Sequence, residues 1–402
     1  MRVLVFCQYY YPEQFLLNEI APELVKRGHE VTVITGLPNY PEGKICTGYE
    51  KRFEEYINGV RVLRCNIIPR GKNKLHLMMN YFSYMRKATQ KSLRLKGDYD
   101  VVFLYQLTPI FQAYPAIKYA RKNNKNLLCY CLDLAPASGE EIFGKLNFLF
   151  SIYRKFSRWA YSNCDLIAVT SCGFIDYLYK THGIPNEKVV YLPQHASDAL
   201  AYADLGKKIS DGITDFLFAG NIGFGARLDF VIEAAFLLKS DGFAFRINIV
   251  GDGRDKLRLM DLVKHKNLES YVFFHDSVPM NEMDKVYSRA DALIVSLRKG
   301  QLTVPGKVQT YMATGKPIFG AMDGSGQELI REAKCGECCD AEDVNGIARM
   351  LENFISNPKR YEDCGRNGRL YFLKHFTLET YCNGLEKLLL ETKNMQTSNS
   401  IY

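Results

Sequence analysis

Long apolar runs are missing from this 402-residue sequence. No stretch reaches the roughly eighteen consecutive apolar residues that a membrane-spanning helix needs. The first ten residues, MRVLVFCQYY, hold one Arg and a brief apolar run but no cleavage site of small residues. They therefore predict a first β-strand and not a signal peptide, and we expect a cytoplasmic protein.

Two common ligand-binding motifs are also missing. Cys335 and Cys338 have C-x-x-C spacing, but no second pair and no His stands at zinc-finger distance. Gly315 and Lys316 are followed by Pro317 and not by the Ser or Thr of a Walker A loop. The sequence predicts no bound metal and no P-loop.

What the chain does contain is a globular composition with surplus positive charge. Hydrophobic residues make up 47% and charged residues 24% of the sequence, which is enough apolar material for two domain cores. The formal net charge of +8 favours an anionic partner, such as a nucleotide, a lipid surface or a nucleic acid. The net charge alone does not choose among them.

Short strands alternate with helical patterns along the whole chain, which indicates parallel sheets flanked by helices. The first half holds strands such as VLVFC and DVVFLY, and the second half holds DFLFAG, FRINIV and ALIVSL. We predict an α/β protein of two doubly wound, Rossmann-like domains that face a cleft. The predicted parts are a first domain (1–198), a linker (199–212), a second domain (213–375), and a terminal helix with a tail (376–402) that packs back on the first domain.

Ligands of parallel sheets bind beyond the carboxyl ends of the strands, so the turns there are the places to examine. In the second half, four such turns bring glycines to a helix start, where free backbone N–H groups can bind an anion. Each turn alone is equally typical of plain chain reversal, but together they predict a nucleotide-diphosphate pocket. The residues in these turns and the intervening DSVP turn are Asn221, Gly223, Arg227, Gly251, Asp252, Ser277, Val278, Gly306, Lys307, Gly326, Gln327 and Glu328.

The first half has no glycine-rich fingerprint after its first strand, so we do not expect it to bind a dinucleotide. Polar residues do follow its strands, namely Glu13, Asn39 and Asp133. They could line an acceptor pocket or act on a hydroxyl group. Each could equally be a helix cap or a turn residue.

Two segments of the first half combine basic and aromatic residues. Residues 70–96 contain eight Lys and Arg and no acid, and residues 143–161 have the same character. Such amphipathic segments suit an anionic membrane surface. Core helices with long basic side chains at their edges are the alternative. A nucleic-acid partner is not expected, because no recognised module accompanies the charge.

Six motifs in this order resemble the GT-B glycosyltransferases of family 4, in particular the bacterial surface-polysaccharide branch that includes N-acetyl-L-fucosamine transferases. The resemblance covers nearly the whole chain. The motifs that carry it are QYYYPEQF…NEIAPELVKRGHEVTVITGLPNYPEGK, HGIPNEKVVYLPQ, AGNIGFGARLDFVIEAA, IVGDG, ADALIVSL and VPGKVQTYMATGKPI.

The resemblance implies a retaining transferase that needs no bound metal. The second domain would hold a nucleotide-sugar donor, usually UDP-linked, and the first domain would bind the acceptor. The leaving diphosphate oxygen would help to deprotonate the acceptor hydroxyl. Carried over by position, Asn221, Gly223, Arg227 and Lys307 fall at the diphosphate, Ser277 and Val278 near the base, and Gly326, Gln327 and Glu328 near the donor sugar.

The sequence also departs from the family pattern. Many members have a Glu just before the Y-M-A segment and a second Glu eight residues upstream, which hold ribose and sugar hydroxyls. Thr310 and Leu302 stand at these positions here. The usual Gln-Gly after N-I-G-x-x is replaced by Ala226 and Arg227.

The leading prediction is transfer of a sugar, an N-acetylhexosamine or its 6-deoxy form, from a UDP-sugar to a lipid-linked saccharide in O-antigen or capsule synthesis. The protein would lie peripherally on the inner membrane face. Glu13, Asp133 and Lys307 are the predicted catalytic residues, and Thr310 is included in the donor site. Alternatives are a UDP-sugar epimerase of the same fold and a non-catalytic, membrane-associated regulator that binds nucleotides.

Overall fold

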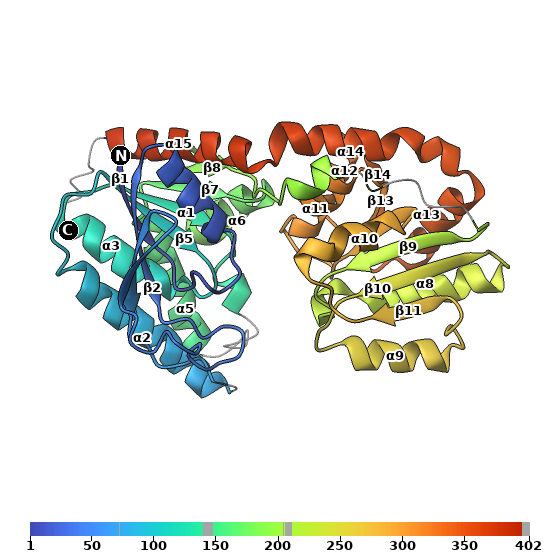
Figure 1. The fold of residues 1–402 in the computed structure, drawn as a ribbon, viewed down its shortest axis with the longest axis horizontal. Coiled ribbons are helices and arrows are strands. Elements are labelled where there is room, and N and C mark those ends of the chain that lie inside the picture. Colours follow the sequence, from blue (N-terminus) through green and yellow to red (C-terminus); the bar gives the residue numbers. More distant parts are fainter. Residues whose placement is uncertain (72, 140–147, 204, 206–210, 396–402) are drawn as a thin grey trace. The chain divides into compact units, whose positions relative to one another are not determined.

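The computed structural model describes residues 1–71, 73–139, 148–203, 205 and 211–395. Within it the chain forms two compact units (Figure 1). Unit 1 contains Met1–Leu192 and the chain from Tyr381 on, and unit 2 contains Pro193–Thr380. Parts of four predicted segments lie outside the described residues: 72 of the first basic segment, 143–147 of the second basic segment, 204 and 206–210 of the linker, and the tail from 396.

Unit 1 is built on an eight-stranded sheet in the order β3-β4-β2-β1-β5-β6-β7-β8. All neighbouring strands are parallel except β3 and β4. The central strands β1, β5 and β6 are almost continuous runs of buried side chains, as expected when helices cover both faces of a sheet. The strands are β1 (Arg2–Phe6), β2 (Glu30–Gly36), β3 (Glu54–Ile57), β4 (Val60–Cys65), β5 (Val101–Gln106), β6 (Leu127–Cys131), β7 (Leu166–Val169) and β8 (Val189–Tyr191).

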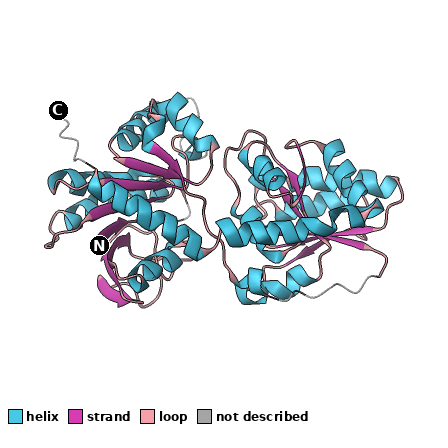
Figure 2. Ribbon diagram, turned by 90° about the horizontal axis from the view of Figure 1, so that it is seen from above, coloured by secondary structure: helices cyan, strands magenta, loops and turns pink. Residues whose placement is uncertain are grey.

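Helices lie on either side of the strands in each unit (Figure 2). In unit 1, α1 ends before Gly28, which has a φ of +87° and terminates the helix as its pattern predicts. The helix α15 (Leu378–Asn394) packs on unit 1, where Asn126 donates to the carbonyl of Thr392. The other helices are α1 (Leu17–Lys26), α2 (Lys74–Ser92), α3 (Ala113–Lys122), α5 (Phe148–Ser162) and α6 (Gly173–His182).

Unit 2 has a six-stranded, wholly parallel sheet in the order β11-β10-β9-β12-β13-β14. The chain order reverses between β9 and β12, which is the place where a Rossmann-like sheet binds its ligand. The strands are β9 (Thr214–Ala219), β10 (Phe245–Val250), β11 (Val272–His275), β12 (Ala292–Ser296), β13 (Ile318–Ala321) and β14 (Gly336–Cys339).

The two faces of this sheet bury separate apolar clusters. One cluster lies under α8, α9 and α13, and the other lies under α7, α10, α11, α12 and α14. Gly315, with a φ of +70°, ends α11, a conformation that glycine adopts readily. The helices are α7 (Ala199–Tyr202), α8 (Leu228–Ser240), α9 (Lys256–His265), α10 (Met283–Ser288), α11 (Gly306–Thr314), α12 (Ser325–Glu332), α13 (Val344–Ser356) and α14 (Glu362–His375).

The predicted fold class is confirmed, since both sheets have Rossmann-like strand order. Three strands were not predicted: the antiparallel edge strand β3, the short β8 and the edge strand β14. β14 includes Cys338 and Cys339, which line up beside β13. These strands are three or four residues long, so they show little periodicity in the sequence.

Candidate donor site

The turns after β9 and β10 pack directly against each other. A Cβ atom at Gly251 would collide with the carbonyl oxygen of Gly220, and one at Gly253 with that of Ile222. The backbone N–H of Ile222 donates to the carbonyl of Asp252 at 2.8 Å. These glycines are therefore required by the close approach of two turns, which holds the backbone at the end of the sheet in one position.

Lys307 lies over the first of these turns, in the first turn of α11. Its Nζ is 4.3 Å from the centre of the Phe218 ring, and its side chain occupies space that a Cβ at Gly220 would fill. Burial lowers the pKa of Lys307 to about 8. Among the described residues, no carboxylate forms an ion pair with this ammonium group. The site thus holds a mostly protonated, poorly solvated cation at neutral pH.

The start of α11 is open. Its N-cap residue, Pro305, provides no side-chain hydrogen bond, and a Cβ at Gly306 would meet nothing within 4 Å. The N–H of Val308 donates to the carbonyl of Pro305 at 2.9 Å, so the first-turn N–H groups open to an anion are those of Gly306 and Lys307. The helix dipole also favours an anion here. Thr310, one turn further on, donates from Oγ1 to the carbonyl of Gly306 at 3.1 Å.

A cavity of about 400 Å³ connects these elements in unit 2. Seven of the residues predicted for the donor site line it, and Gly306 lies beside it at the start of α11. The seven are Asn221, Gly251, Asp252, Ser277, Val278, Lys307 and Thr310. The structure thus brings together residues from four separate turns that the sequence spreads over ninety positions.

The sequence prediction did not include the apolar and aromatic part of this cavity. Tyr311 closes one side: its hydroxyl accepts from the N–H of Ala219 at 2.8 Å and donates to the carbonyl of the same residue. Tyr311 could have been found, because it stands four residues after Lys307 and so on the same helix face. The other lining residues not predicted are Ala219, Gly220, Val250, Met283 and Tyr287.

Gly223 and Arg227 lie outside the lining of the cavity. Arg227, with a φ of +43°, forms ion pairs with Asp229 at 3.2 Å and with Glu342 at 2.6 Å. Its guanidinium group also stacks over Phe230. Two carboxylates already satisfy this charge, so Arg227 would have to leave them to reach a phosphate.

The predicted sugar-binding turn, Gly326 to Glu328, begins α12 and does not line the cavity either. It does lie near the start of α11, because a Cβ at Gly326 would be 3.6 Å from Pro305. The Nε2 of Gln327 is buried without a hydrogen-bond partner among the described residues, whereas Glu328 is exposed. This turn is thus a neighbour of the cavity.

In unit 1, Glu13 is 4% exposed and follows β1. Its Oε1 accepts from the backbone N–H groups of Asn39 and Tyr40, both at 2.7 Å. Burial raises the pKa of Glu13 to about 7 despite these bonds. Glu13 therefore joins the turn after β1 to the turn after β2.

Asp133 has a similar position after β6. Its Oδ2 accepts from the backbone N–H of Thr108 at 2.9 Å, and burial raises its pKa. Both predicted acids of unit 1 thus lie beyond the carboxyl ends of central strands and hold turns in place. Their structural roles are visible, and their part in catalysis stays a prediction.

Two kinds of feature, a metal-binding cluster and a membrane-spanning helix, are absent from the described residues. No group of three or more His, Cys, Asp or Glu side chains in this part of the chain could hold a metal ion. None of the described helices is both long enough and apolar enough to cross a membrane.

The class of the protein follows from fold and sequence together. Residues 16–194 match the family described as "Glycosyltransferase Family 4", and residues 207–371 match "Glycosyl transferases group 1". Between them the two matches take in nearly all of both sheets. The chain belongs to the family 4 glycosyltransferases and has the GT-B fold, which confirms the predicted family and enzyme class.

Particular relatives can also be named. The sequence is 26% identical over 391 residues to WcaI of Escherichia coli (strain K12), a protein assigned to colanic acid biosynthesis as a glycosyl transferase, with 89% of this chain and 93% of WcaI covered. The fold is similar to that of sucrose-phosphate synthase from Thermosynechococcus elongatus, with a TM-score of 0.73, 15% identity, and 97% and 98% of the chains covered. It is also similar to Anabaena HepE in complex with UDP, with a TM-score of 0.72, 13% identity, and 97% and 100% covered.

Proposed function

We propose that this glycosyltransferase moves a sugar from a UDP-sugar to a lipid-linked saccharide during synthesis of a bacterial surface polysaccharide, with retention of configuration. The observation that carries the proposal is Lys307, a half-buried cation without a carboxylate partner among the described residues, at an open helix start inside a cavity of about 400 Å³. The relation to WcaI supports the polysaccharide context, and the UDP in the HepE complex supports the donor. The narrower resemblance to N-acetyl-L-fucosamine transferases is the reason for proposing an N-acetylhexosamine or its 6-deoxy form.

The proposed chemistry depends on charge and needs no protein nucleophile. Lys307 and the first-turn N–H groups of α11 bind the diphosphate and stabilise the negative charge that grows on it as the bond to the sugar breaks. The acceptor oxygen forms its bond to the anomeric carbon on the same face, and its proton passes to the departing phosphate oxygen. An anion beside Lys307 also raises the pKa of the lysine, so that the ammonium form persists during the reaction.

Unit 1 is the proposed acceptor-binding part. Burial raises the pKa of both predicted acids, that of Glu13 to about 7, so that Glu13 can hold or release a proton near neutral pH. We assign them to the acceptor end, where they would bind its hydroxyl groups. Lys307 remains the residue that acts on the leaving group.

A lipid-linked acceptor lies in a membrane, and unit 1 has a surface suited to membrane binding. On α2, Leu75, Met79 and Phe82 are 68%, 40% and 43% exposed and follow one helix face. On α5, the exposed apolar residues are Phe148, Leu149 and Ile152. The rings of Phe82, Phe111 and Phe156 connect the two helices, with centroid distances of 5.0 and 5.1 Å. The exposed basic residues of these helices are Lys74, Arg86, Lys87, Arg154, Lys155 and Arg158.

This combination of apolar rows and basic side chains suits the cytoplasmic face of a membrane, which is anionic. Six exposed apolar side chains on two linked helices exceed the scattered surface residues of ordinary proteins. We therefore place the protein peripherally on the inner membrane face.

UDP binding tests the donor site. UDP should raise the melting temperature of the wild-type protein, and Lys307→Ala should weaken UDP binding by about 10- to 100-fold, as expected for loss of a charged hydrogen bond. The control is Lys316→Ala, which changes the lysine after the other end of α11 and should leave the shift intact. A melting shift with GDP but not with UDP would refute the assignment of the donor nucleotide.

A further inference from the structure

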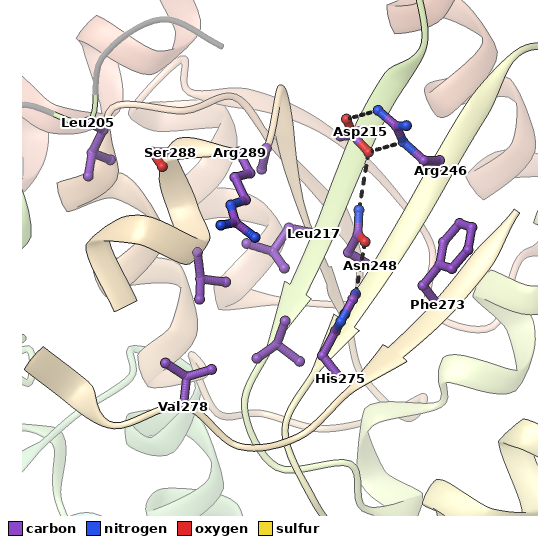
Figure 3. Close-up of a pocket in the computed structure, with 13 residues that line it drawn as sticks. Leu205, Asp215, Leu217, Arg246, Asn248, Phe273, His275, Val278, Ser288 and Arg289 are labelled. Carbon is purple, nitrogen blue, oxygen red and sulfur yellow. Dashed lines mark hydrogen bonds and ion pairs between the residues drawn. The ribbon is translucent and has the colours of Figure 1, made fainter. Parts of the chain in front are cut away.

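A second, larger cavity of about 790 Å³ adjoins the donor cavity in unit 2 (Figure 3). It extends along the face of β9, β10 and β11, with α10 opposite. The two cavities share Val250 and Val278. A ligand seated in the donor cavity therefore has a way into the larger one across Val250.

Ala219, Val250 and His275 form a row across the sheet where the two cavities meet. In the parallel sheet, Val250 is the register partner of Ala219 on one side and of His275 on the other, so the three side chains point to the same face. Ala219 lines the donor cavity, and His275 lines the larger one. Neighbouring strands lie about 4.8 Å apart, so an aromatic base lying over Val250 would bring its edge to His275.

A chain of hydrogen bonds determines the tautomer of the His275 ring (Figure 3). Arg246 forms an ion pair with the buried Asp215 and donates to both of its carboxylate oxygens, each at 2.7 Å. An ionised carboxylate only accepts, so the amide nitrogen of Asn248 must face it, as it does at 3.2 Å.

The orientation of the Asn248 amide determines which ring nitrogen of His275 carries the proton. The amide oxygen of Asn248 faces Nε2 of His275 at 3.0 Å, and because this oxygen can only accept, Nε2 must carry a proton. In the neutral ring the other nitrogen, Nδ1, then presents a lone pair. The ion pair between Arg246 and Asp215 thus makes Nδ1 of His275 a hydrogen-bond acceptor.

We propose that the base of the donor nucleotide lies across Val250, beside Val278, and that Nδ1 of His275 accepts a hydrogen bond from its ring N–H. Uracil carries such a group at N3, whereas cytosine has a lone pair at the same position, which would oppose that of Nδ1. His275 is then a specificity residue for the base, and Asn248 is a positioning residue that acts through it. This inference rests on the proposed donor site.

UDP and CDP form a matched pair for the test, since they share ribose and diphosphate and differ only at this edge of the base. By calorimetry at about pH 7.5, the wild-type protein should bind UDP more tightly than CDP by on the order of tenfold. His275→Ala should bring the two affinities together, mainly by weakening UDP. His275 is exposed, so this variant should fold.

Asn248→Leu tests the positioning role. It should reduce the UDP preference, and the ¹⁵N chemical shifts of His275 should change from the Nε2–H tautomer to a mixture, which loss of packing alone would not produce. Arg289→Ala is the control, because Arg289 lines the same cavity on the α10 side and should not affect the ratio.

Equal binding of UDP and CDP by the wild-type protein, or an unchanged ratio in His275→Ala, would overturn the base assignment alone. If Lys307→Ala also retained full UDP affinity, the donor site itself would be wrong. If the wild-type protein bound neither nucleotide, the donor site would fail and the base assignment with it.

Discussion

Lys307 is the only cation among the described residues that line the donor cavity. Its environment combines three effects: an aromatic ring beneath it, low exposure to water, and an open helix start beside it. The ring attracts the ammonium group and so holds it in place, whereas low solvation and the helix start each favour an anionic ligand. Because the three coincide at one residue, the electrostatics of the site point to a diphosphate more directly than any single motif does.

Thr310 is one of the residues at which the sequence departs from the family pattern. It lines the donor cavity but donates its hydroxyl to its own helix, so it offers the ligand little. Thr310→Glu places a carboxylate where many members of the family hold ribose and sugar hydroxyls. We expect UDP to bind about tenfold more tightly, because a hydrogen bond to a charged group contributes about 1.5 kcal/mol or more.

Calorimetry of UDP binding checks this expectation, with Thr310→Val as the control. Valine has the shape of threonine and loses only the bond to Gly306, so its UDP affinity should stay close to that of the wild-type protein. Weaker binding by Thr310→Glu would show that this chain holds the ribose differently from its relatives.

Glu13 should make stability depend on pH. Burial raises its folded pKa to about 7 from an ordinary value of 4.5, so between these values the folded protein retains a proton that the unfolded chain has lost. This contribution is complete below about pH 4.5 and is lost as the pH rises through 7. The free energy of unfolding should therefore fall by about 3 kcal/mol across this window.

Urea unfolding at several pH values tests the effect in the wild-type protein and in Glu13→Gln. Glutamine keeps an acceptor oxygen for the N–H groups of Asn39 and Tyr40 but does not titrate. The variant should show a flatter profile, and parallel profiles would mean that Glu13 has an ordinary pKa in the folded protein.

At the scale of single elements, α2 and α5 are set apart by their exposed apolar rows. A double variant of α2, Leu75→Ser with Met79→Ser, should bind vesicles containing anionic phospholipid about 30- to 150-fold more weakly, since about 2 to 3 kcal/mol of apolar burial would be lost. Sedimentation with the vesicles measures this binding.

Leu257→Ser is a suitable control for vesicle binding, because Leu257 is 77% exposed on α9 of unit 2. Its binding should match that of the wild-type protein. If all three proteins sedimented equally, or none did, the membrane surface proposed on unit 1 would be wrong.

The predictability of the elements followed their length and periodicity. Long buried strands such as β5 and β6, and helix ends marked by Gly28 and Gly315, could be predicted because the local sequence determines them. The edge strands β3 and β14 could not, since a strand of four residues depends on the neighbour that it pairs with.

The candidate site divides in the same way. Lys307 and the turns at the strand ends are local signals in the sequence, and residues of these turns line one cavity in the structure. The partners of Arg227 are not local, because Glu342 is 115 positions away in the chain. The sequence could not show that this charge is already satisfied, nor that Val250 and His275 lie in register.

At the scale of the whole molecule, one architecture occurs twice. In both sheets the strand order reverses beside the first strand of the unit, which is β1 in unit 1 and β9 in unit 2. In both, polar turns lie beyond the carboxyl ends of the strands. In unit 2 these turns contain glycines, a lysine and an open helix start, whereas in unit 1 they contain the buried Glu13 and the half-buried Asp133. The difference in charge supports assigning the anionic donor to unit 2 and the hydroxyl-bearing acceptor to unit 1.

Sugar transfer itself is the most direct test of this account. A panel of nucleotide sugars is offered to the full chain with a lipid-diphosphate saccharide, and products are read by mass spectrometry. We predict that a UDP-sugar extends the acceptor by one residue and that Lys307→Ala reduces the product at least tenfold. Three results would contradict it. These are transfer at the wild-type rate by Lys307→Ala, conversion of the UDP-sugar to an epimer without acceptor, and no product from any donor.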